Sequence, residues 1–260
     1  QALLAAGFSQ VDLYDIAEKD FPSKLARGGY DVAFPALHGR YGEDGCIQGF
    51  LEILHIPYAF SGVLASAVGT EKEFAKAVYR SAGIRAPRGF DMPAGRVLTA
   101  DEEAQVVERL GLPLFVKPCG NGSSYGISRV NSREELAGAI ALAGSAGQRV
   151  LVEECIEGTE ITVPVIGNEE PEALPIVEIA YDAEFYDLKV KYEPSALHHI
   201  IPARLDPEVY ALAQDMACRA HKALGCRGCS RSDFIVTAAG EPVILETNTI
   251  PGMTASSLLP

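Results

Sequence analysis

The stretch Arg231-Ser-Asp-Phe-Ile-Val-Thr-Ala-Ala-Gly-Glu-Pro-Val-Ile-Leu-Glu-Thr-Asn248 decides the fold of the C-terminal half of this chain. Two apolar runs flank a short segment that ends in glycine. This pattern predicts a β-hairpin with strands at residues 232–237 and 242–247. The hairpin is informative because its two strands carry acidic and amide side chains at alternating positions.

The register of the hairpin predicts a cluster of polar side chains. With a turn centred between Ala239 and Gly240, Asp233 lies opposite Glu246 and Arg231 lies opposite Asn248. Residues two apart on a strand share a face, so these four side chains lie together. Cross-strand neighbours are about 5 Å apart, and two carboxylates at that distance repel unless a cation lies between them. Asp233, Glu246 and Asn248 therefore predict a Mg²⁺ site. A solvated face with alternating charges is the alternative, and an odd-length loop would break the register.

The remaining sequence reads as three blocks, at residues 1–70, 71–153 and 154–260. In the third block, Asp206-Pro207 predicts the start of a long helix that ends before Gly225. In the second, Thr70-Glu-Lys-Glu73 predicts a capping box with Thr70 as N-cap. Further helices are expected at residues 71–82, 99–110, 48–54 and from Ser132; strands are expected at 11–14, 31–37, 114–116, 149–153, 160–166 and 172–177.

The first block is expected to be a small α/β unit that is truncated at its N-terminal side. Its opening Gln1-Ala-Leu-Leu-Ala-Ala-Gly7 is typical of the end of a helix, with glycine as the stop. Further residues are therefore expected before Gln1.

Two lysines and a glycine-rich loop are candidates for binding phosphate. Lys117 ends an apolar strand, and Lys72 lies in the first turn of a helix, where the helix dipole disfavours a cation. The loop 120–126 includes Gly122, Ser123 and Ser124, whose backbone and hydroxyl groups could approach phosphates. The loop is neither a P-loop nor a dinucleotide fingerprint. A surface lysine, an edge lysine and an ordinary turn are the alternatives.

Two further segments have the layout of site loops. His38-Gly-Arg-Tyr-Gly-Glu-Asp-Gly45 follows a predicted strand, although a structural turn histidine explains it equally well. Pro251-Gly252-Met-Thr254 follows the hairpin and could direct the Gly252 N–H at a developing oxyanion.

The composition narrows the class of protein. The formal net charge of −13 argues against duplex nucleic acid as a partner, but a nucleotide needs only local positive charge. No apolar run reaches the roughly 20 residues of a membrane span, so a cytoplasmic enzyme is expected. Cys226 and Cys229 form a C-x-x-C without the second pair that a zinc site needs, which leaves a redox role as the weaker alternative.

Taken together, these motifs resemble the D-alanine–D-alanine ligases of the ATP-grasp superfamily. The matching strings occur in the order found in the family and span essentially the whole chain. They are His38-Gly-x-x-Gly-Glu-Asp-Gly45, Lys117-Pro with Gly122-Ser-Ser-x-Gly126, Arg231-x-Asp233, and Glu246-x-Asn248-Thr-x-Pro-Gly-Met-Thr254. The resemblance implies an α/β (α+β) chain with the ATP-grasp fold and an N-terminal Rossmann-like α/β domain. The three blocks then correspond to that domain and to the central and C-terminal ATP-grasp subdomains.

The resemblance also implies roles for individual residues at the nucleotide. ATP would lie between the second and third blocks, with two Mg²⁺ ions (or Mn²⁺) at the hairpin. The implied phosphate ligands are Lys72, Lys117 and the loop with Gly122, Ser123 and Ser124; those for adenine and ribose are Glu153, Glu154, Ile156 and Glu160. Lys191 and Tyr192 would belong to a mobile loop, with Tyr192 bonded to Ser123 over the closed site.

At the amino acids, the resemblance implies a D-alanyl acylphosphate that the amine of a second D-alanine attacks. Arg231 and Gly252 would stabilise the oxyanion, Ser257 would bind the second carboxylate, and His38 would lie near the first. Tyr192 favours a dipeptide over a D-lactate ester. The family serves peptidoglycan synthesis and is commonly dimeric. Its N-terminal glutamate, first strand and closing helix have no counterpart here. Another ATP-grasp carboxylate–amine ligase and a non-catalytic nucleotide-binding module are the alternatives.

Overall fold

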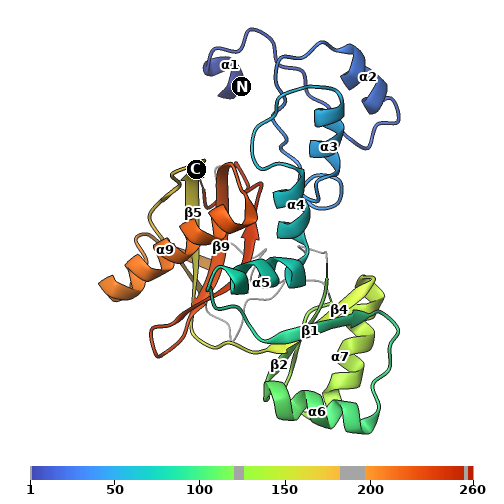
Figure 1. Cartoon of the computed structure of the whole chain (residues 1–260), viewed down its shortest axis with the longest axis vertical. Coiled ribbons are helices and arrows are strands. Elements are labelled where there is room, and N and C mark those ends of the chain that lie inside the picture. The colour runs from blue at the N-terminus through green and yellow to red at the C-terminus, as the bar shows by residue number, and fades with distance from the viewer. Residues whose placement is uncertain (1, 120–125, 182–196, 255–256, 260) are drawn as a thin grey trace.

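The computed structural model of the chain describes residues 2–119, 126–181, 197–254 and 257–259. Figure 1 shows helices at the N-terminal end of an elongated molecule and two sheets, one in the middle and one at the far end. The described residues form both helices and two β-sheets, so the predicted mixed α/β class is confirmed. The division at residues 70 and 153 stays a prediction.

The N-terminal part contains three short helices. These are α1 (Ala2–Ala5), α2 (Phe21–Arg27) and α3 (Cys46–Ile53). The predicted helix at 48–54 is thus confirmed. Helices α2 and α3 contribute to a small core, whereas α1 buries no residue. The predicted strands at 11–14 and 31–37 are wrong for the described residues. Ala33 makes a single parallel bridge to Tyr58, with bonds to Pro57 and Ala59 of 2.8 and 3.0 Å. A strand needs a longer ladder than this.

The predicted capping box at Thr70 is also wrong. Thr70 ends a helix that the sequence interpretation missed, α4 (Val63–Thr70). Its hydroxyl donates to the carbonyls of Glu43 (2.8 Å) and Ser66 (3.1 Å). Thr70 precedes the N-cap position of α5 (Lys72–Ser81), which is Glu71, so it is not the cap of that helix. Lys72 nevertheless opens that helix, as predicted.

The sheet from the central part of the sequence, called the central sheet below, lies at the far end of the molecule in Figure 1 and has the antiparallel order β1-β4-β2-β3. Its strands are β1 (Gly89–Pro93), β2 (Leu114–Pro118), β3 (Ser128–Val130) and β4 (Arg149–Glu154). Helices α6 (Ala100–Leu110) and α7 (Arg133–Ala146) cover one face with apolar side chains. A capping box does form at α6, between Thr99 and Glu102. At α7, Ser132 is the N-cap, but Glu135 accepts from the N–H of Asn131 instead.

The C-terminal sheet has the order β10-β9-β5-β7-β8, with β6 beside β5. Its strands are β5 (Thr159–Gly167), β6 (Glu172–Ala173), β7 (Val177–Tyr181), β8 (Leu197–Ile200), β9 (Gly228–Val236) and β10 (Pro242–Asn248). The predicted strand 172–177 is divided between β6 and β7. Pro175, which has no N–H for a ladder, lies in the break.

Helix α9 (Pro207–Leu224) packs against this sheet (Figure 1). As predicted, Asp206 is its N-cap and Pro207 its first residue, and Gly225 ends it in the left-handed conformation (φ 72°). Helix α5 contributes Ala75 and Tyr79 to the same core. The core of the C-terminal sheet therefore holds the helix that starts at Lys72.

The predicted pairing at the polar end of the hairpin is confirmed, but the turn differs from the prediction. Near the turn, Val236 pairs with Pro242 and Phe234 with Ile244, so the turn is centred on Ala239. A β-bulge between Ile244 and Glu246 then shifts the register by one residue. The bulge offsets the odd-length loop and brings Glu246 opposite Asp233 and Asn248 opposite Arg231.

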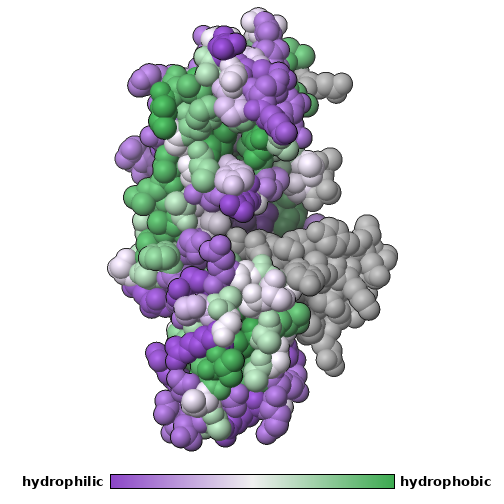
Figure 2. All heavy atoms as spheres, turned by 90° about the vertical axis from the view of Figure 1, so that its right-hand side faces the viewer, coloured by the Kyte–Doolittle hydropathy of each residue, from purple (hydrophilic) through white to green (hydrophobic). Residues whose placement is uncertain are grey.

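Two surface and core features bear on the alternative functions. No helix among the described residues is both long and apolar enough to cross a membrane. Hydrophilic side chains are spread over the face drawn in Figure 2, between smaller hydrophobic areas.

Burial raises the pKa of the Cys226 and Cys229 thiols to about 11, so both are protonated near neutral pH. A thiol redox role gains no support, because the thiolate is the reactive form.

The buried His221 makes stability depend on pH. It lies in the last turn of α9, and its Nδ1 is 2.8 Å from the Ser230 hydroxyl. Burial lowers its pKa, opposed in part by backbone groups of Gly167 and Cys226. The unfolded chain therefore takes up a proton near pH 6.5 that the folded chain still excludes. The contribution of His221 to the free energy of unfolding is therefore fully present above that pH. It is lost as the pH falls further, by at most about 1.4 kcal/mol per pH unit.

Urea unfolding at pH 7.5 and 5.5 measures this effect. We expect His221→Gln to remove part of the acid-side loss, since glutamine does not titrate. The exposed His55 supplies the matched control, because His55→Gln should keep the wild-type difference. An equal pH dependence in wild type and His221→Gln would contradict this assignment.

Candidate active site

The polar face of the β9–β10 hairpin joins the predicted arginine to the predicted metal ligands. Arg231 donates to both oxygens of Asp233 at 3.2 and 3.3 Å. Asn248 donates its amide to Asp233 at 3.4 Å, and Thr162 of β5 donates its hydroxyl at 2.5 Å. Asp233 is thus held by three strands of one sheet.

Lys72 reaches this face from the start of α5. Its ammonium contacts the carboxylate of Glu246, and the Lys72 side chain is only 13% exposed. Attraction by Lys72 lowers the pKa of Glu246 to about 2, against the effect of burial. Burial works against the charge of Lys72, but the attraction of Glu246, Glu153 and Asp233 outweighs it and raises the Lys72 pKa. Both groups are therefore charged at neutral pH.

A second buried ion cluster lies beside the first. Glu153 of β4 contacts Lys117 of β2 through one carboxylate oxygen and Lys76 of α5 through the other. Burial lowers the pKa of Lys117, and the nearby Lys72 and Lys76 lower it further, while Glu153 opposes them. Of the two lysines that contact Glu153, Lys117 remains partly exposed, at 16%. The predicted phosphate ligands Lys72 and Lys117 thus lie in one connected cluster of charges.

The donor set at the hairpin fits Mg²⁺. Among the described residues, no group of three or more His, Cys, Asp or Glu side chains is arranged to hold a metal. Asp233 and Glu246 supply two carboxylates and Asn248 an amide, which suits an ion that keeps water and takes phosphate oxygens as further ligands. The two carboxylates are 19% and 35% exposed, so they can be reached from solution.

The His38 loop is built by side chain–backbone bonds. Glu43 accepts from the N–H of Gly39 at 2.7 Å and lies 3.2 Å from Nδ1 of His38. The carbonyl of Glu43 accepts from Thr70, two residues before Lys72. The loop is therefore attached to the start of α5, and His38 remains 58% exposed.

The residues predicted to meet the adenine and ribose lie at the end of β4, in the connection to β5 and on β5. Both oxygens of Glu154 accept from Arg88, at 2.8 Å from the side chain and 2.9 Å from the backbone N–H. The backbone N–H of Glu154 in turn donates to the Arg88 carbonyl at 2.9 Å, so Arg88 holds both the side chain and the backbone of Glu154. Ile156 lies in the connection to β5, and Glu160 on β5 itself.

The loop after β10 brings Gly252 and Ser257 together. A Cβ atom at Gly252 would lie 2.7 Å from the Ser257 hydroxyl, so only glycine fits there without a shift. The Ser257 hydroxyl accepts from the N–H of Thr254 at 3.0 Å. The remaining predicted site residues lie outside the described residues; they are Gly122, Ser123, Ser124, Lys191 and Tyr192.

The sequence interpretation missed three residues that support this site: Lys76, Tyr79 and Thr247. Lys76 lies one helical turn after Lys72, on the face that also buries Tyr79. The Tyr79 hydroxyl donates to Thr247 at 2.9 Å, between the two ligands on β10. The spacing 72, 76, 79 is a signal for one helix face, but it does not reveal that a lysine there is buried.

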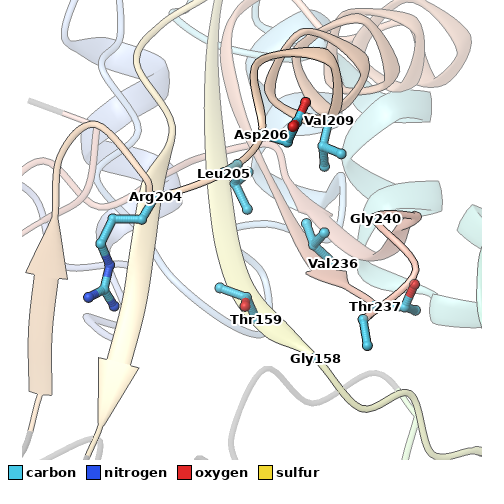
Figure 3. A pocket seen from close by; sticks show the side chains of 10 residues that line it. Gly158, Thr159, Arg204, Leu205, Asp206, Val209, Val236, Thr237 and Gly240 are labelled. Atoms are coloured by element: carbon cyan, nitrogen blue, oxygen red, sulfur yellow. The ribbon is translucent and has the colours of Figure 1, made fainter.

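A separate pocket of about 340 Å³ lies at the other end of the hairpin. Figure 3 shows it between the start of β5, the start of α9 and the β9–β10 turn. Residues Gly158, Thr159, Val236 and Gly240 are among those that line it. None of the lining residues is a predicted site residue.

Two family models match this chain. The family described as D-ala D-ala ligase C-terminus matches residues 81–260, and the one described as D-ala D-ala ligase N-terminus matches residues 12–61. The D-alanine–D-alanine ligase of Pelotomaculum thermopropionicum is 45% identical over 93% of the chain and 77% of its own length. That of Pelobacter propionicus is 45% identical over 100% of the chain and 81% of its own length.

Solved structures of ligases are also similar. The D-alanine–D-alanine ligase of Bacillus anthracis complexed with ATP has a TM-score of 0.79 at 33% identity, over 94% of this chain and 76% of that one. The VanG D-Ala:D-Ser ligase of Enterococcus faecalis has a TM-score of 0.77 at 39% identity, over 88% of this chain and 66% of that one. The predicted ATP-grasp fold is thereby confirmed. With both family models matched and relatives of 45% identity covered over most of their length, the chain belongs to the D-alanine–D-alanine ligase family of ATP-dependent ligases.

Proposed function

We propose that the chain joins two D-alanines to D-alanyl-D-alanine at the expense of ATP, as a step in making peptidoglycan precursors in the cytoplasm. The observation that carries this proposal is the polar face of the hairpin. It combines Arg231 with Asp233, Glu246 and Asn248 and receives Lys72 from α5. A non-catalytic nucleotide-binding module would have no need of this set.

The first half of the reaction moves a phosphoryl group to the carboxylate of one D-alanine. Lys72 and Lys117 bind the phosphates; Lys72 is held by Glu246, which is 35% exposed, and Lys117 by the buried Glu153. Asp233, Glu246 and Asn248 would hold two Mg²⁺ ions, or Mn²⁺ in their place, which would neutralise charge on the phosphates. The protein itself mainly supplies position and counter-charge. Gly122, Ser123 and Ser124 would lie at the phosphates, and Glu154, Ile156 and Glu160 at the nucleoside, whereas Glu153 is 3% exposed and bonded to Lys76 and Lys117.

The second half joins the amine of the other D-alanine to the acylphosphate carbon. Arg231 and the N–H of Gly252 stabilise the oxyanion that forms, and phosphate leaves. Ser257 and Arg231 bind the second carboxylate, and His38 lies near the first. Lys191 and Tyr192 close the site against water, which would hydrolyse the acylphosphate. The active species is proposed to be a homodimer.

Phosphate release from ATP tests the proposal. Release should rise strongly with D-alanine and stay at background with L-alanine, and mass spectrometry should show the dipeptide. ATP hydrolysis that does not depend on D-alanine would overturn the assignment. A product from a different acid and amine would support another ATP-grasp ligase.

A second candidate is a ligase that adds D-serine. It is favoured by the 39% identity to the VanG D-Ala:D-Ser ligase. Competition of equal D-alanine and D-serine concentrations for the second position distinguishes the two. We expect the D-alanine dipeptide to predominate, and an excess of the D-serine product would select the second candidate.

A further inference from the structure

Lys76 is the most deeply buried cation of the site, and the proposed reaction does not use it. Its side chain is 1% exposed, against 13% for Lys72 and 16% for Lys117. It contacts Glu153 and lies 3.1 Å from Glu73, which belongs to its own helix. It is therefore too enclosed to meet a ligand itself.

Its position decides how the charge of Glu153 is divided. Glu153 is 3% exposed and presents one oxygen to Lys76 and the other to Lys117. With Lys117 alone, the carboxylate would neutralise that lysine completely. With both lysines present, Glu153 is shared between Lys76 and Lys117 and neutralises Lys117 only in part, while Glu73 faces Lys76 alone.

The part of the Lys117 charge that Glu153 does not neutralise lies at the more exposed of the two lysines. Of the two lysines on Glu153, only Lys117 is exposed enough to meet an anion. Repulsion from Lys72 and Lys76 already opposes its charged form. A phosphate group would relieve that repulsion, and such a contact is strong where water is excluded.

We propose that Lys76 is a positioning residue, which binds Glu153 so that Lys117 remains available for the phosphates of ATP. A purely structural ion pair is the alternative, and it predicts a loss of stability without a selective loss of nucleotide affinity. The inference rests on the proposed function, because ATP is the anion concerned.

The test compares wild type, Lys76→Met, Glu153→Gln and the double variant by calorimetric titration with ATP. Lys76→Met should raise the dissociation constant for ATP about tenfold, as expected when a residue that orients a ligand-binding group is lost. The KM for ATP should rise in parallel, with a smaller change in kcat. In the Glu153→Gln background, the same substitution should change the dissociation constant by no more than about twofold.

Two variants serve as controls. Arg80→Gln removes one positive charge from the exposed part of the same helix and should leave ATP affinity unchanged. Lys76→Arg retains the charge and should restore most of the affinity. Thermal unfolding of each variant separates binding from stability.

Several results would overturn the inference. Equal losses of affinity in both backgrounds would show that Lys76 does not act through Glu153. Unchanged affinity with a lower melting temperature would favour the structural ion pair. If Lys76→Met does not fold, the dissociation constants for ATP of Glu153→Gln and the double variant are compared with each other. A difference well above twofold between them would contradict the inference. Wild-type protein that fails to bind ATP would instead refute the proposed function.

Discussion

Replacing Glu246 by glutamine is expected to reduce dipeptide formation roughly a thousandfold, or about 4 kcal/mol of transition-state stabilisation. The pKa of Glu246 is lowered to about 2, so the wild-type side chain is a carboxylate at any ordinary assay pH. Glutamine keeps the size but loses the charge for Mg²⁺. It also leaves the buried Lys72 without its partner.

Glu241→Gln provides the matched control. It is the same chemical change in the same hairpin, five residues earlier, at a half-exposed side chain that pairs with Arg85. This variant should keep near-wild-type activity. The measurement is dipeptide formation at saturating ATP and D-alanine over a series of Mg²⁺ concentrations. Retention of more than a tenth of the activity by Glu246→Gln would contradict the proposed metal site.

Replacing Arg231 by lysine is expected to lower kcat by about a hundredfold or more, with ATP affinity nearly unchanged. Arginine offers planar, paired donors, whereas lysine is a point charge on a flexible chain. The Arg231 guanidinium already contacts both oxygens of Asp233, which aligns it beside the metal ligands. Lysine cannot keep that geometry and also reach an oxyanion.

Arg204→Lys is the matched control for this prediction. Arg204 also forms a two-point contact with a carboxylate, Glu178, but its side chain is 68% exposed and lies outside the hairpin face. Its replacement should leave kcat within about twofold of wild type. Calorimetry gives the ATP dissociation constant, and steady-state kinetics give kcat and the KM for the second D-alanine. An Arg231→Lys enzyme with normal kcat would refute the oxyanion role.

The ion pairs of the cluster explain why these two substitutions should be severe. Each acidic side chain forms an ion pair with a basic one: Lys72 contacts Glu246, and Arg231 contacts Asp233. Removing one partner leaves the other charged group largely buried and without compensation, which is more costly than losing a surface ion pair. Thermal melting of both variants should therefore be measured alongside their activity.

Local patterns in the sequence determined the elements that need only neighbouring residues. Asp206-Pro207 and Gly225 delimit α9 because capping, the fixed φ of proline and the left-handed conformation of glycine are local properties. Alternating polar residues predicted the face of the hairpin, and the ordered motifs pointed to the ligase family. Where a segment needs a partner, as at residues 11–14 and 31–37, the local sequence predicted strands that did not form.

Only the tertiary structure decided the contacts that assemble the site. The bulge between Ile244 and Glu246 corrects a register that the loop length would have broken. Lys76 and Glu153 are 77 positions apart, and their contact depends on how α5 packs beside the central sheet. A lysine in a helix looks the same in sequence whether it is solvated or buried. Its environment is set by distant residues, and so are the ion pairs that surround Lys117.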